Sequence, residues 1–368
     1  MKPHFSNKIF VFSLITGLIT ILSCNKFENS KIAETYLDTN EPDYGFKSTS
    51  PEWNAKIHLG RVLFYDKALS VNNSVSCASC HKQEVAFADN VAQSRGFENK
   101  LTGRNSIAIQ NLGNTSIMDI GFEINTPLFW DGRERNITSL ISKPIANHIE
   151  MGMDNPEALI TKLNQLPYYK SLVQNAYQVD KLDMTIIANA MVQFISQITT
   201  QNARFDQSKM FNGTQLHPLS ALEQQGEQLF NTTYNCAKCH HPNVGPYITE
   251  DFANIGLDLN NTDKGRMSVT NSSADEGKFK VPDLHNVALT APYMHDGRFK
   301  SLEDVLEHYS NNIKANSHLD NRLQNPDGTP ISFNISESDK KAIIAFLGSM
   351  TDYKTITNPN LSSPFKSR

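Results

Sequence analysis

The hydrophobic and polar positions along the chain predict a short apolar leader, a polar tether and then a folded body. Ile9 to Ile21 form a 13-residue apolar run, and residues 25–49 are polar without a sustained period. The apolar run is too short to cross a bilayer comfortably and is typical of a secretory signal. We expect the folded body to begin at Ser50-Pro51, an N-cap followed by a first helical residue.

Apolar residues at helical spacing predict helices in both halves of the body. They are Trp53, Ile57, Leu63 and Phe64, then Ile187, Met191, Phe194, Ile195 and Ile198 within 185–198, then Leu219, Leu222, Leu229 and Phe230 around and beyond the capping box Ser220–Glu223. Two further capped helices are expected over 301–309 and 336–347. Residues 243–280 are rich in Gly, Asn, Asp and Ser and predict a long loop. No convincing strand period occurs, so the predicted class is all-α.

Three short sequence motifs occur twice in the same order. The first half has Gly60-x-x-Leu63-Phe64, Cys77-x-x-Cys80-His81 and Asp131-Gly132-Arg133; the second has Gly226-x-x-Leu229-Phe230, Cys236-x-x-Cys239-His240 and Asp296-Gly297-Arg298. The separations from the first cysteine to the aspartate are 54 and 60 residues. Repeated motifs in one order predict two tandem domains of related structure.

The two C-x-x-C-H frames carry the strongest chemical signal in the chain. This spacing lets two thiols add to the vinyl groups of one haem, with the following histidine as the proximal iron ligand. Cys77, Cys80 and His81 therefore predict one covalent c-type haem. Cys236, Cys239 and His240 predict a second.

A redox dithiol, a disulfide or part of a zinc site are the alternatives for each C-x-x-C pair. Four thiolates from both frames could also bind one zinc ion, but this leaves the two following histidines unexplained. The export signal favours the haem interpretation, because bacterial covalent haem attachment takes place outside the cytoplasm.

The fifth cysteine ends the apolar leader in Ile21-Leu22-Ser23-Cys24, which is similar to a bacterial lipobox. The prediction is lipidation at Cys24, with an ordinary cleaved signal and a stray cysteine as the alternative. The protein is then expected in the bacterial cell envelope, periplasmic and lipid-anchored to a membrane. Loss of Lys2 and Lys8 with the signal lowers the net charge from −4 to about −6, and no basic stripe predicts nucleic-acid binding.

The predicted organisation has five segments. They are a lipoprotein signal peptide at 1–23, a polar tether at 24–50, an N-terminal cytochrome c domain at 51–210, a C-terminal cytochrome c domain at 211–355 and a tail at 356–368. The length of 368 residues is ample for two domains with separate cores.

Several stretches together resemble the bacterial di-haem cytochrome c peroxidases, a group that includes the MauG-type enzymes. They are Phe129–Arg133, the pair Glu150-Met151, Phe279–Pro282 and Leu289–Gly297, added to the two haem frames. The resemblance covers about residues 51–352. It implies two tandem cytochrome c-like domains, a first haem where peroxide reacts, a second haem that passes electrons, and a calcium ion between them.

The resemblance also implies roles for single residues. Glu150 matches a distal acid-base carboxylate, and moving a proton between the peroxide oxygens requires such a group. Trp130 matches the tryptophan between the haems. Asn105, Thr290 and Pro292 match calcium contacts, the last two through backbone carbonyls.

Two departures from the family pattern change the expected chemistry. No histidine occurs in residues 82–129, where peroxidases that need reductive activation carry a distal ligand, so the first iron is expected to be open to peroxide at rest. Tyr309 lies where a methionine binds the second iron in many relatives, as in the MauG type. A phenolate ligand predicts a low reduction potential; His308 and Met294 are competing ligands, and core packing is the simpler alternative for Tyr309.

Smaller departures are Leu140, where many relatives have a distal glutamine, and Asp283 and His285, where threonine and arginine are common. They affect the expected distal hydrogen-bond network and one haem-propionate contact.

The leading hypothesis is a peroxidase that reduces H2O2 with electrons from a small c-type cytochrome or a cupredoxin. A MauG-like oxidase of a protein or small molecule is the alternative, and a non-catalytic di-haem electron carrier is a third. A homodimer is one candidate assembly.

Overall fold

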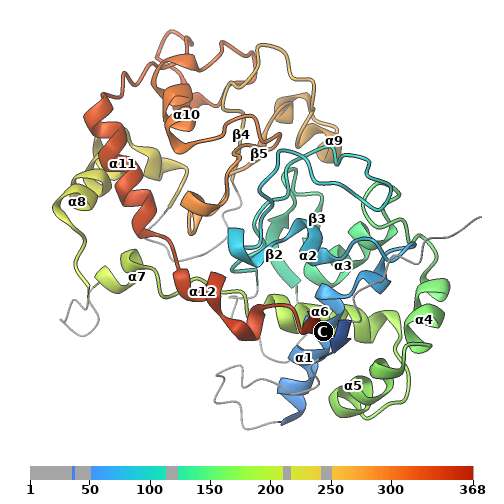
Figure 1. Cartoon of the computed structure of the whole chain (residues 1–368). Coiled ribbons are helices and arrows are strands. Elements are labelled where there is room, and N and C mark those ends of the chain that lie inside the picture. The colour runs from blue at the N-terminus through green and yellow to red at the C-terminus, as the bar shows by residue number, and fades with distance from the viewer. Residues whose placement is uncertain (1–34, 38–50, 113–122, 210–216, 242–250, 368) are drawn as a thin grey trace, which may run out of the picture.

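The computed structural model describes residues 35–37, 51–112, 123–209, 217–241 and 251–367, and helices predominate in it (Figure 1). The principal helices are α1 (Pro51–Tyr65), α2 (Cys77–Cys80), α3 (Ile137–Ala146), α4 (Pro156–Asn164), α5 (Pro167–Tyr177), α6 (Met184–Ile195), α7 (Arg204–Ser208), α8 (Ala221–Gln228), α9 (Met267–Thr270), α10 (Leu302–Glu307), α11 (Glu337–Ser349) and α12 (Tyr353–Thr357). The strands are β1 (Thr35–Leu37), β2 (Glu123–Leu128), β3 (Glu134–Asn136), β4 (Phe252–Ala253), β5 (Phe279–Lys280) and β6 (Phe365–Ser367).

The core of the first half is built where α1 packs against α5 and α6. Ile57, Leu63 and Phe64 of α1 are fully buried, as their spacing predicts, and Trp53 packs partly buried against the same cluster. The side chain of Asp183 caps α6 by accepting a hydrogen bond from the Ile186 N–H. The helix ends at Ile195, three residues before the expected end, and the chain continues through a turn to the buried Ile198.

The core of the second half is built where α8 packs against α11. The predicted capping box is present: Ser220 Oγ accepts the Glu223 N–H, and Glu223 accepts the Ser220 N–H at 2.8 Å. The end of α8 continues as the π-helical turn η3 (Leu229–Thr233), which buries Phe230 and leads to the second C-x-x-C-H frame. The expected helices over 301–309 and 336–347 are also present, as α10 with the π-helical turn η8 (His308–Asn312) and as α11.

The repeat extends to helix packing that the local motifs do not reveal. A Cβ atom on Gly60 would lie 1.9 Å from the Ala190 carbonyl oxygen and 2.9 Å from Phe194 Cβ in α6. A Cβ atom on Gly226 would lie 2.0 Å from the Ala342 carbonyl oxygen and 2.8 Å from Phe346 Cβ in α11. In both halves, therefore, the helix before the haem frame crosses an Ala-x-x-x-Phe helix at a glycine.

Replacement of Gly226 by alanine is expected to lower the free energy of unfolding by about 1–3 kcal/mol, because α8 and α11 must separate to admit the Cβ atom. Urea denaturation followed by circular dichroism measures this change. The matched control is Gly348→Ala in α11, where an added Cβ meets no atom within 4 Å. The control should stabilise the protein by up to ~1 kcal/mol through helix propensity. Equal effects of the two substitutions would contradict the close crossing.

The all-α prediction requires one correction, since three two-stranded antiparallel sheets accompany the helices: β1–β6, β2–β3 and β4–β5. The expected loop at 243–280 contains β4, α9 and β5 within its described residues. Strands β4 and β5 have two residues each, which is too short to show an alternating pattern, so neither strand could be predicted from the sequence.

The segment predicted as a C-terminal tail, 356–368, packs against the first half. Arg61 of α1 donates hydrogen bonds to the carbonyl oxygens of Ser362 (2.6 Å) and Pro359 (2.9 Å), and Tyr65 donates to that of Leu361 (2.7 Å). Strand β6 pairs with β1, which lies in the predicted tether. The predicted signal peptide and Cys24 lie outside the described residues. Among the residues that are described, no helix is both long and apolar enough to span a bilayer.

Candidate haem sites

The first C-x-x-C-H frame forms a short helix followed by a turn that orients His81. Cys77 and Cys80 open and close α2, and His81 Nδ1 lies 3.0 Å from the Phe87 carbonyl oxygen. Ala86 and Phe87 both have left-handed backbone angles, with φ of 57° and 58°, which turn this carbonyl towards the imidazole. Nδ1–H donation to a carbonyl is the usual arrangement of a histidine that binds iron through Nε2.

The second frame repeats this orientation with a different partner. The 3₁₀ turn η4 (Cys236–Lys238) follows Asn235, which has φ of 57°, and His240 Nδ1 lies 3.1 Å from the Pro282 carbonyl oxygen. Burial lowers the pKa of both His81 and His240, against the pull of the neighbouring carbonyls. Both imidazoles are therefore neutral and suited to bind iron.

The four cysteines of the frames form no disulfide, and Cys77 and Cys236 pack against the two apolar core clusters. Burial raises the pKa of Cys77 and Cys236 to about 12 and that of Cys80 and Cys239 to about 11. Cys77 and Cys236 also belong to separate core clusters, so the fold does not gather the four thiols for one zinc ion.

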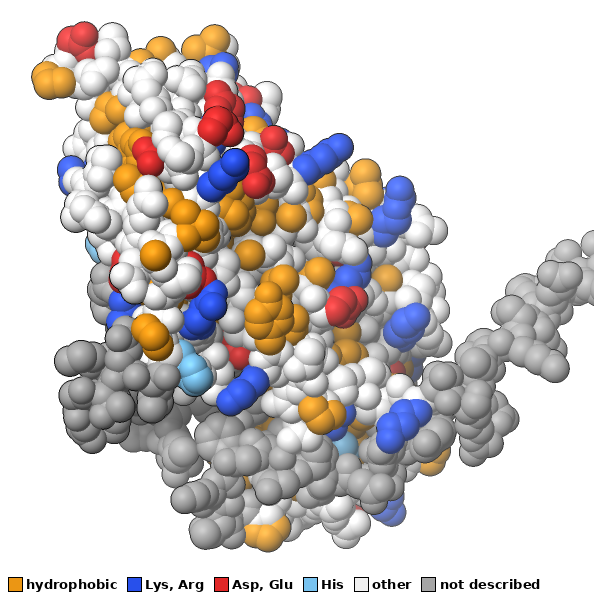
Figure 2. All heavy atoms as spheres, turned by 60° about the vertical axis from the view of Figure 1, so that its left-hand side comes forward, with side chains coloured by type: hydrophobic (Ala, Val, Ile, Leu, Met, Phe, Trp, Pro, Cys, Tyr) orange, Lys and Arg blue, Asp and Glu red, His pale blue; other side chains and the backbone are white. Residues whose placement is uncertain are grey.

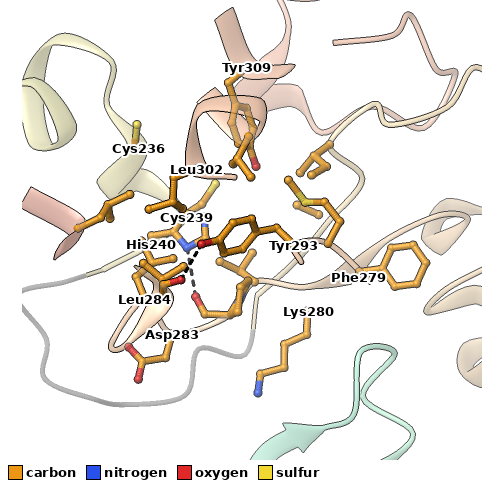
Figure 3. A pocket seen from close by; sticks show the side chains of 18 of the residues that line it. Cys236, Cys239, His240, Phe279, Lys280, Asp283, Leu284, Tyr293, Leu302 and Tyr309 are labelled. Atoms are coloured by element: carbon orange, nitrogen blue, oxygen red, sulfur yellow. Dashed lines mark hydrogen bonds between the residues drawn. The ribbon is translucent and has the colours of Figure 1, made fainter. Parts of the chain in front are cut away.

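A cavity of about 430 Å³ adjoins the second frame (Figure 3). Its walls include Cys236, Cys239 and His240, together with apolar residues from α10 and α11 such as Leu302, Leu306, Ile343 and Leu347. A mostly apolar cavity that contains two thiols and an oriented imidazole suits a covalently attached haem. The residues present thus fit the group that the frame implies.

Three residues compete as the second ligand of this haem, and the structure separates His308 from the other two. Tyr309 and Met294 line the cavity, and Figure 3 shows the Tyr309 side chain pointing into it from η8. Burial raises the pKa of Tyr309, and negative charges on Cys239 and Cys236 would raise it further. The phenol therefore lies near both thiols. His308 is not among the lining residues, and its Nε2 lies 2.9 Å from the Ile255 carbonyl oxygen. Tyr309 and Met294 therefore both adjoin the haem position, and Tyr309 as the ligand stays a prediction.

Trp130 lies where the two halves meet. Its indole Nε1–H donates to the Asn105 carbonyl oxygen at 2.9 Å, and its own carbonyl accepts the Lys280 N–H at 2.8 Å. The Asn105 N–H in turn donates to the His295 carbonyl at 2.8 Å. Trp130 and Asn105 also line the cavity of the second frame, so backbone hydrogen bonds from both halves hold the indole beside it.

The three residues expected to contact calcium lie around one cavity. Asn105, Thr290 and Pro292 all line the cavity of the second frame. The Asn105 amide nitrogen donates to the Val91 carbonyl at 3.0 Å, which orients this side chain. Amide and carbonyl oxygens are ligands that calcium accepts, and the calcium site stays a prediction.

Glu150 lies in a turn after α3 and close to the first frame. The Asn147 amide donates to Glu150 Oε1 at 3.3 Å, and the Glu150 carbonyl accepts the Phe97 N–H at 2.9 Å. Burial raises the pKa of Glu150, and Arg133 partly opposes this shift. The charge of Glu150 raises the pKa of both Cys77 and Cys80, which places the carboxyl group near that haem position. Leu140 of α3 packs partly buried against the first core.

An ion-pair cluster between the halves was not anticipated from the sequence. Arg104 donates to Asp131 at 2.6 Å and to both carboxylate oxygens of Asp263 at 2.7 and 2.8 Å. Asp131 adjoins Trp130, and Asp263 belongs to the second half, so the guanidinium joins the two sides next to the indole. The partners are 27 and 159 residues from Arg104 in sequence, a separation at which no local pattern relates them.

A second unanticipated cluster surrounds His285. Its Nδ1 lies 2.8 Å from Asp283 and its Nε2 lies 3.1 Å from Asp206, and the ring is buried. The two carboxylates raise the pKa of His285 to about 10 in spite of burial, so the imidazole is a cation at neutral pH. His285 thus places a buried positive charge between two carboxylates.

The raised pKa of His285 makes stability depend on pH. Because the folded pKa of about 10 exceeds the unfolded value of about 6.5, the stabilisation is fully present below pH ~6.5 and is lost as the pH rises towards 10. The free energy of unfolding should therefore fall between pH 7 and pH 10 in urea titrations. His285→Gln should remove most of this slope, whereas the exposed His148→Gln should retain it. An unchanged slope in His285→Gln would contradict the assignment of the cation.

Comparisons with known proteins agree with the candidate haem sites described above. The family described as di-haem cytochrome c peroxidase matches residues 54–214. The chain is 31% identical over 273 residues to cytochrome c551 peroxidase of Nitrosomonas europaea, covering 73% of this chain and 76% of the relative. It is 28% identical over 309 residues to the methylamine utilization protein MauG of Methylorubrum extorquens, covering 83% and 81%.

A solved structure has a similar fold. The crystal structure of a MauG-like protein associated with microbial copper homeostasis superposes with a TM-score of 0.72 at 26% identity, covering 84% of this chain and 93% of that one. The family match at residues 54–214 includes the first haem frame, Trp130 and Glu150. The chain is a haem peroxidase oxidoreductase that belongs to the di-haem cytochrome c peroxidase family, which also contains MauG.

Proposed function

We propose that this protein reduces H2O2 to water at the haem of the Cys77–His81 frame, with electrons relayed from the Cys236–His240 frame. When bound, the two haems supply the iron that reacts with peroxide and the redox centres that store and deliver electrons. The observation that carries the proposal is Glu150, a half-buried carboxyl group with a raised pKa whose charge acts on both thiols of the first frame.

The proposed role of Glu150 is to move a proton between the two peroxide oxygens. Partial burial raises its pKa, and a carboxyl group with a raised pKa suits a group that accepts a proton and returns it. Residues 82–129 contain no histidine, which supports an iron that is open to peroxide without prior reduction. His81 would hold the haem iron, and its Nδ1 contact with the Phe87 carbonyl orients the imidazole for this role.

Trp130 and Tyr309 set the proposed electron path. The indole bonds to the Asn105 carbonyl and the Trp130 backbone carbonyl accepts the Lys280 N–H, so the residue is fixed between the halves beside the cavity, which supports a bridging role. A Tyr309 phenolate would favour ferric iron at the second frame. A calcium ion at Asn105, Thr290 and Pro292 would add rigidity between the halves.

The proposed electron donor is a small c-type cytochrome or a cupredoxin. On the face in Figure 2, Lys and Arg side chains are interspersed with acidic ones and form no continuous basic surface, in keeping with a protein rather than a nucleic-acid partner. The leader and Cys24 support a lipid-anchored protein of the cell envelope.

A second candidate function is a MauG-like oxidase that uses H2O2 to oxidise a protein or a small molecule. The position of Tyr309 beside Cys236 and Cys239 favours it, because a phenolate ligand would make the second haem a poor acceptor of electrons from high-potential donors.

One experiment tests the function and a second separates the two candidates. Purified ferric holoprotein is mixed with H2O2 in a stopped-flow instrument without prior reduction, and the haem absorbance is expected to change rapidly. An absorbance that stays constant would leave only the electron-carrier hypothesis. Steady-state turnover with a reduced c-type cytochrome then separates peroxidase from oxidase, since the oxidase should accept these electrons poorly.

A further inference from the structure

Two adjacent tyrosines of α5 share one buried carboxylate next to the first haem frame. The hydroxyl groups of Tyr168 and Tyr169 each donate to Asp66 Oδ2 at 2.7 Å, and the ring centroids lie 4.7 Å apart. The other oxygen, Asp66 Oδ1, accepts the Ala68 N–H at 2.8 Å. Asp66 is only 6% exposed, so its negative charge is held by these three donors.

The pair has an inner and an outer end. Tyr169 is 1% exposed and belongs to the core cluster against which Cys77 packs. A charge on Cys77 would raise the pKa of Tyr169, which places the phenol near the thiol that attaches the first haem. Tyr168 is half-buried and contacts Phe365 of β6 edge to face, with centroids 6.2 Å apart. The two rings therefore lead from the first haem position towards solvent.

Packing alone does not account for this cluster. A buried carboxylate carries a desolvation cost, and replacing such polar groups by apolar residues of similar size is often neutral or stabilising. Two phenols on one carboxylate oxygen instead give each tyrosine a base within hydrogen-bond distance. Oxidation of tyrosine requires such a base, because the phenol must lose its proton together with an electron.

We propose that Tyr169 and Tyr168 form a redox-active pair that carries an oxidising equivalent from the first haem to the protein surface, with Asp66 as the shared proton acceptor. The inference rests on the proposed function, because the oxidant is the first haem after its reaction with H2O2. The pair provides an outlet when electrons from the second haem are not supplied.

Each step balances in electrons and protons. Tyr169 gives one electron to the oxidised haem and its phenolic proton to Asp66, which forms a neutral tyrosyl radical and a neutral carboxyl group. Tyr168 then gives one electron to Tyr169, Asp66 returns its proton to Tyr169, and the Tyr168 proton passes to Asp66. A one-electron organic reductant in solution finally reduces Tyr168, which recovers its proton from Asp66. No charged radical is left in the apolar core at any step.

Tyr65 is the matched control in the same core. Its ring lies 5.2 Å from Phe64, which contacts Phe87 at 6.1 Å, so it is also close to the first frame. Its hydroxyl donates to the Leu361 carbonyl oxygen at 2.7 Å. A backbone carbonyl cannot accept a phenolic proton, so Tyr65 should not be oxidised in this way.

The test is electron paramagnetic resonance of the ferric holoprotein frozen after mixing with H2O2 in the absence of reductant. The expected result is a tyrosyl signal that narrows when the protein is made with ring-deuterated tyrosine. Tyr169→Phe should abolish the signal, Tyr65→Phe should keep it, and Asp66→Asn should reduce it. A nitroso spin trap should label Tyr168 in the unmodified protein and lose this label in Tyr169→Phe, as located by peptide mass spectrometry.

The outcomes distinguish the two proposals. A haem spectrum that does not respond to H2O2 would overturn the proposed function and remove the oxidant. A haem spectrum that responds without a tyrosyl signal, or a signal that persists in Tyr169→Phe, would overturn the redox-active pair alone. Tyr169→Phe removes a single hydroxyl group, and circular dichroism with the haem absorbance confirms that this variant folds and carries haem.

Discussion

Glu150→Gln should slow the reaction of the ferric holoprotein with H2O2 by ~10²- to 10⁴-fold, the usual contribution of a general acid-base group. Glutamine has nearly the same shape and can keep the contact with the Asn147 amide, but it cannot accept and return a proton. The rate of the haem absorbance change after mixing measures the effect directly. The matched control is Glu157→Gln on the exposed start of α4, which should leave the rate unchanged.

The pH profile adds a second readout for Glu150. Burial raises its pKa above the ordinary value of 4.5, so the ionised form that accepts a proton is lost as the pH falls through this raised value. The rate with H2O2 should therefore fall on the acid side in the unmodified protein. The glutamine variant should lack that acid limb. A variant that reacts at the original rate would remove Glu150 from the mechanism.

Tyr309→Met should raise the reduction potential of the second haem by about 0.1 V or more, because a thioether stabilises ferrous iron where a phenolate stabilises ferric iron. Spectroelectrochemical titration measures the two haem potentials, and only one of them should move. The first haem lies in a separate core cluster and serves as an internal reference.

The control for Tyr309 is another tyrosine of the same cavity. Tyr293 lines it as well, but its hydroxyl donates to the Val287 carbonyl at 3.0 Å. Tyr293→Phe should leave both potentials close to those of the unmodified protein. If Tyr309→Met also leaves both reduction potentials unchanged, Met294 becomes the ligand to examine, since it lines the same cavity.

The C-x-x-C-H frames show how local chemistry can be predicted from sequence. Covalent attachment needs two thiols and a histidine within five consecutive residues, so the frame is complete before any tertiary contact forms. The structure then adds the orientation of each histidine, through Phe87 for His81 and through Pro282 for His240. Phe87 lies six residues from its histidine and Pro282 lies 42, so only the first of these contacts is local.

The helices were predictable wherever a cap and an apolar period coincide. Ser220, Ser301 and Ser336 each begin a helix where the sequence predicts one, because a cap and its hydrogen bonds span only four residues. The short strands β4 and β5 were missed because two residues show no period. The crossing glycines Gly60 and Gly226 were visible as a repeat, but their contacts with α6 and α11 were not.

By itself, the sequence determined the two haem frames, the duplicated order of motifs, the capped helices and the absence of histidine from residues 82–129. Each of these depends on residue types within a few positions of one another or on their order along the chain. Only the tertiary structure decided that Tyr309 faces the second cavity, that Arg104 joins Asp131 to Asp263, and that Asp66 accepts two tyrosines about a hundred residues away. Such contacts follow from how helices pack, and packing brings together residues that no local pattern relates.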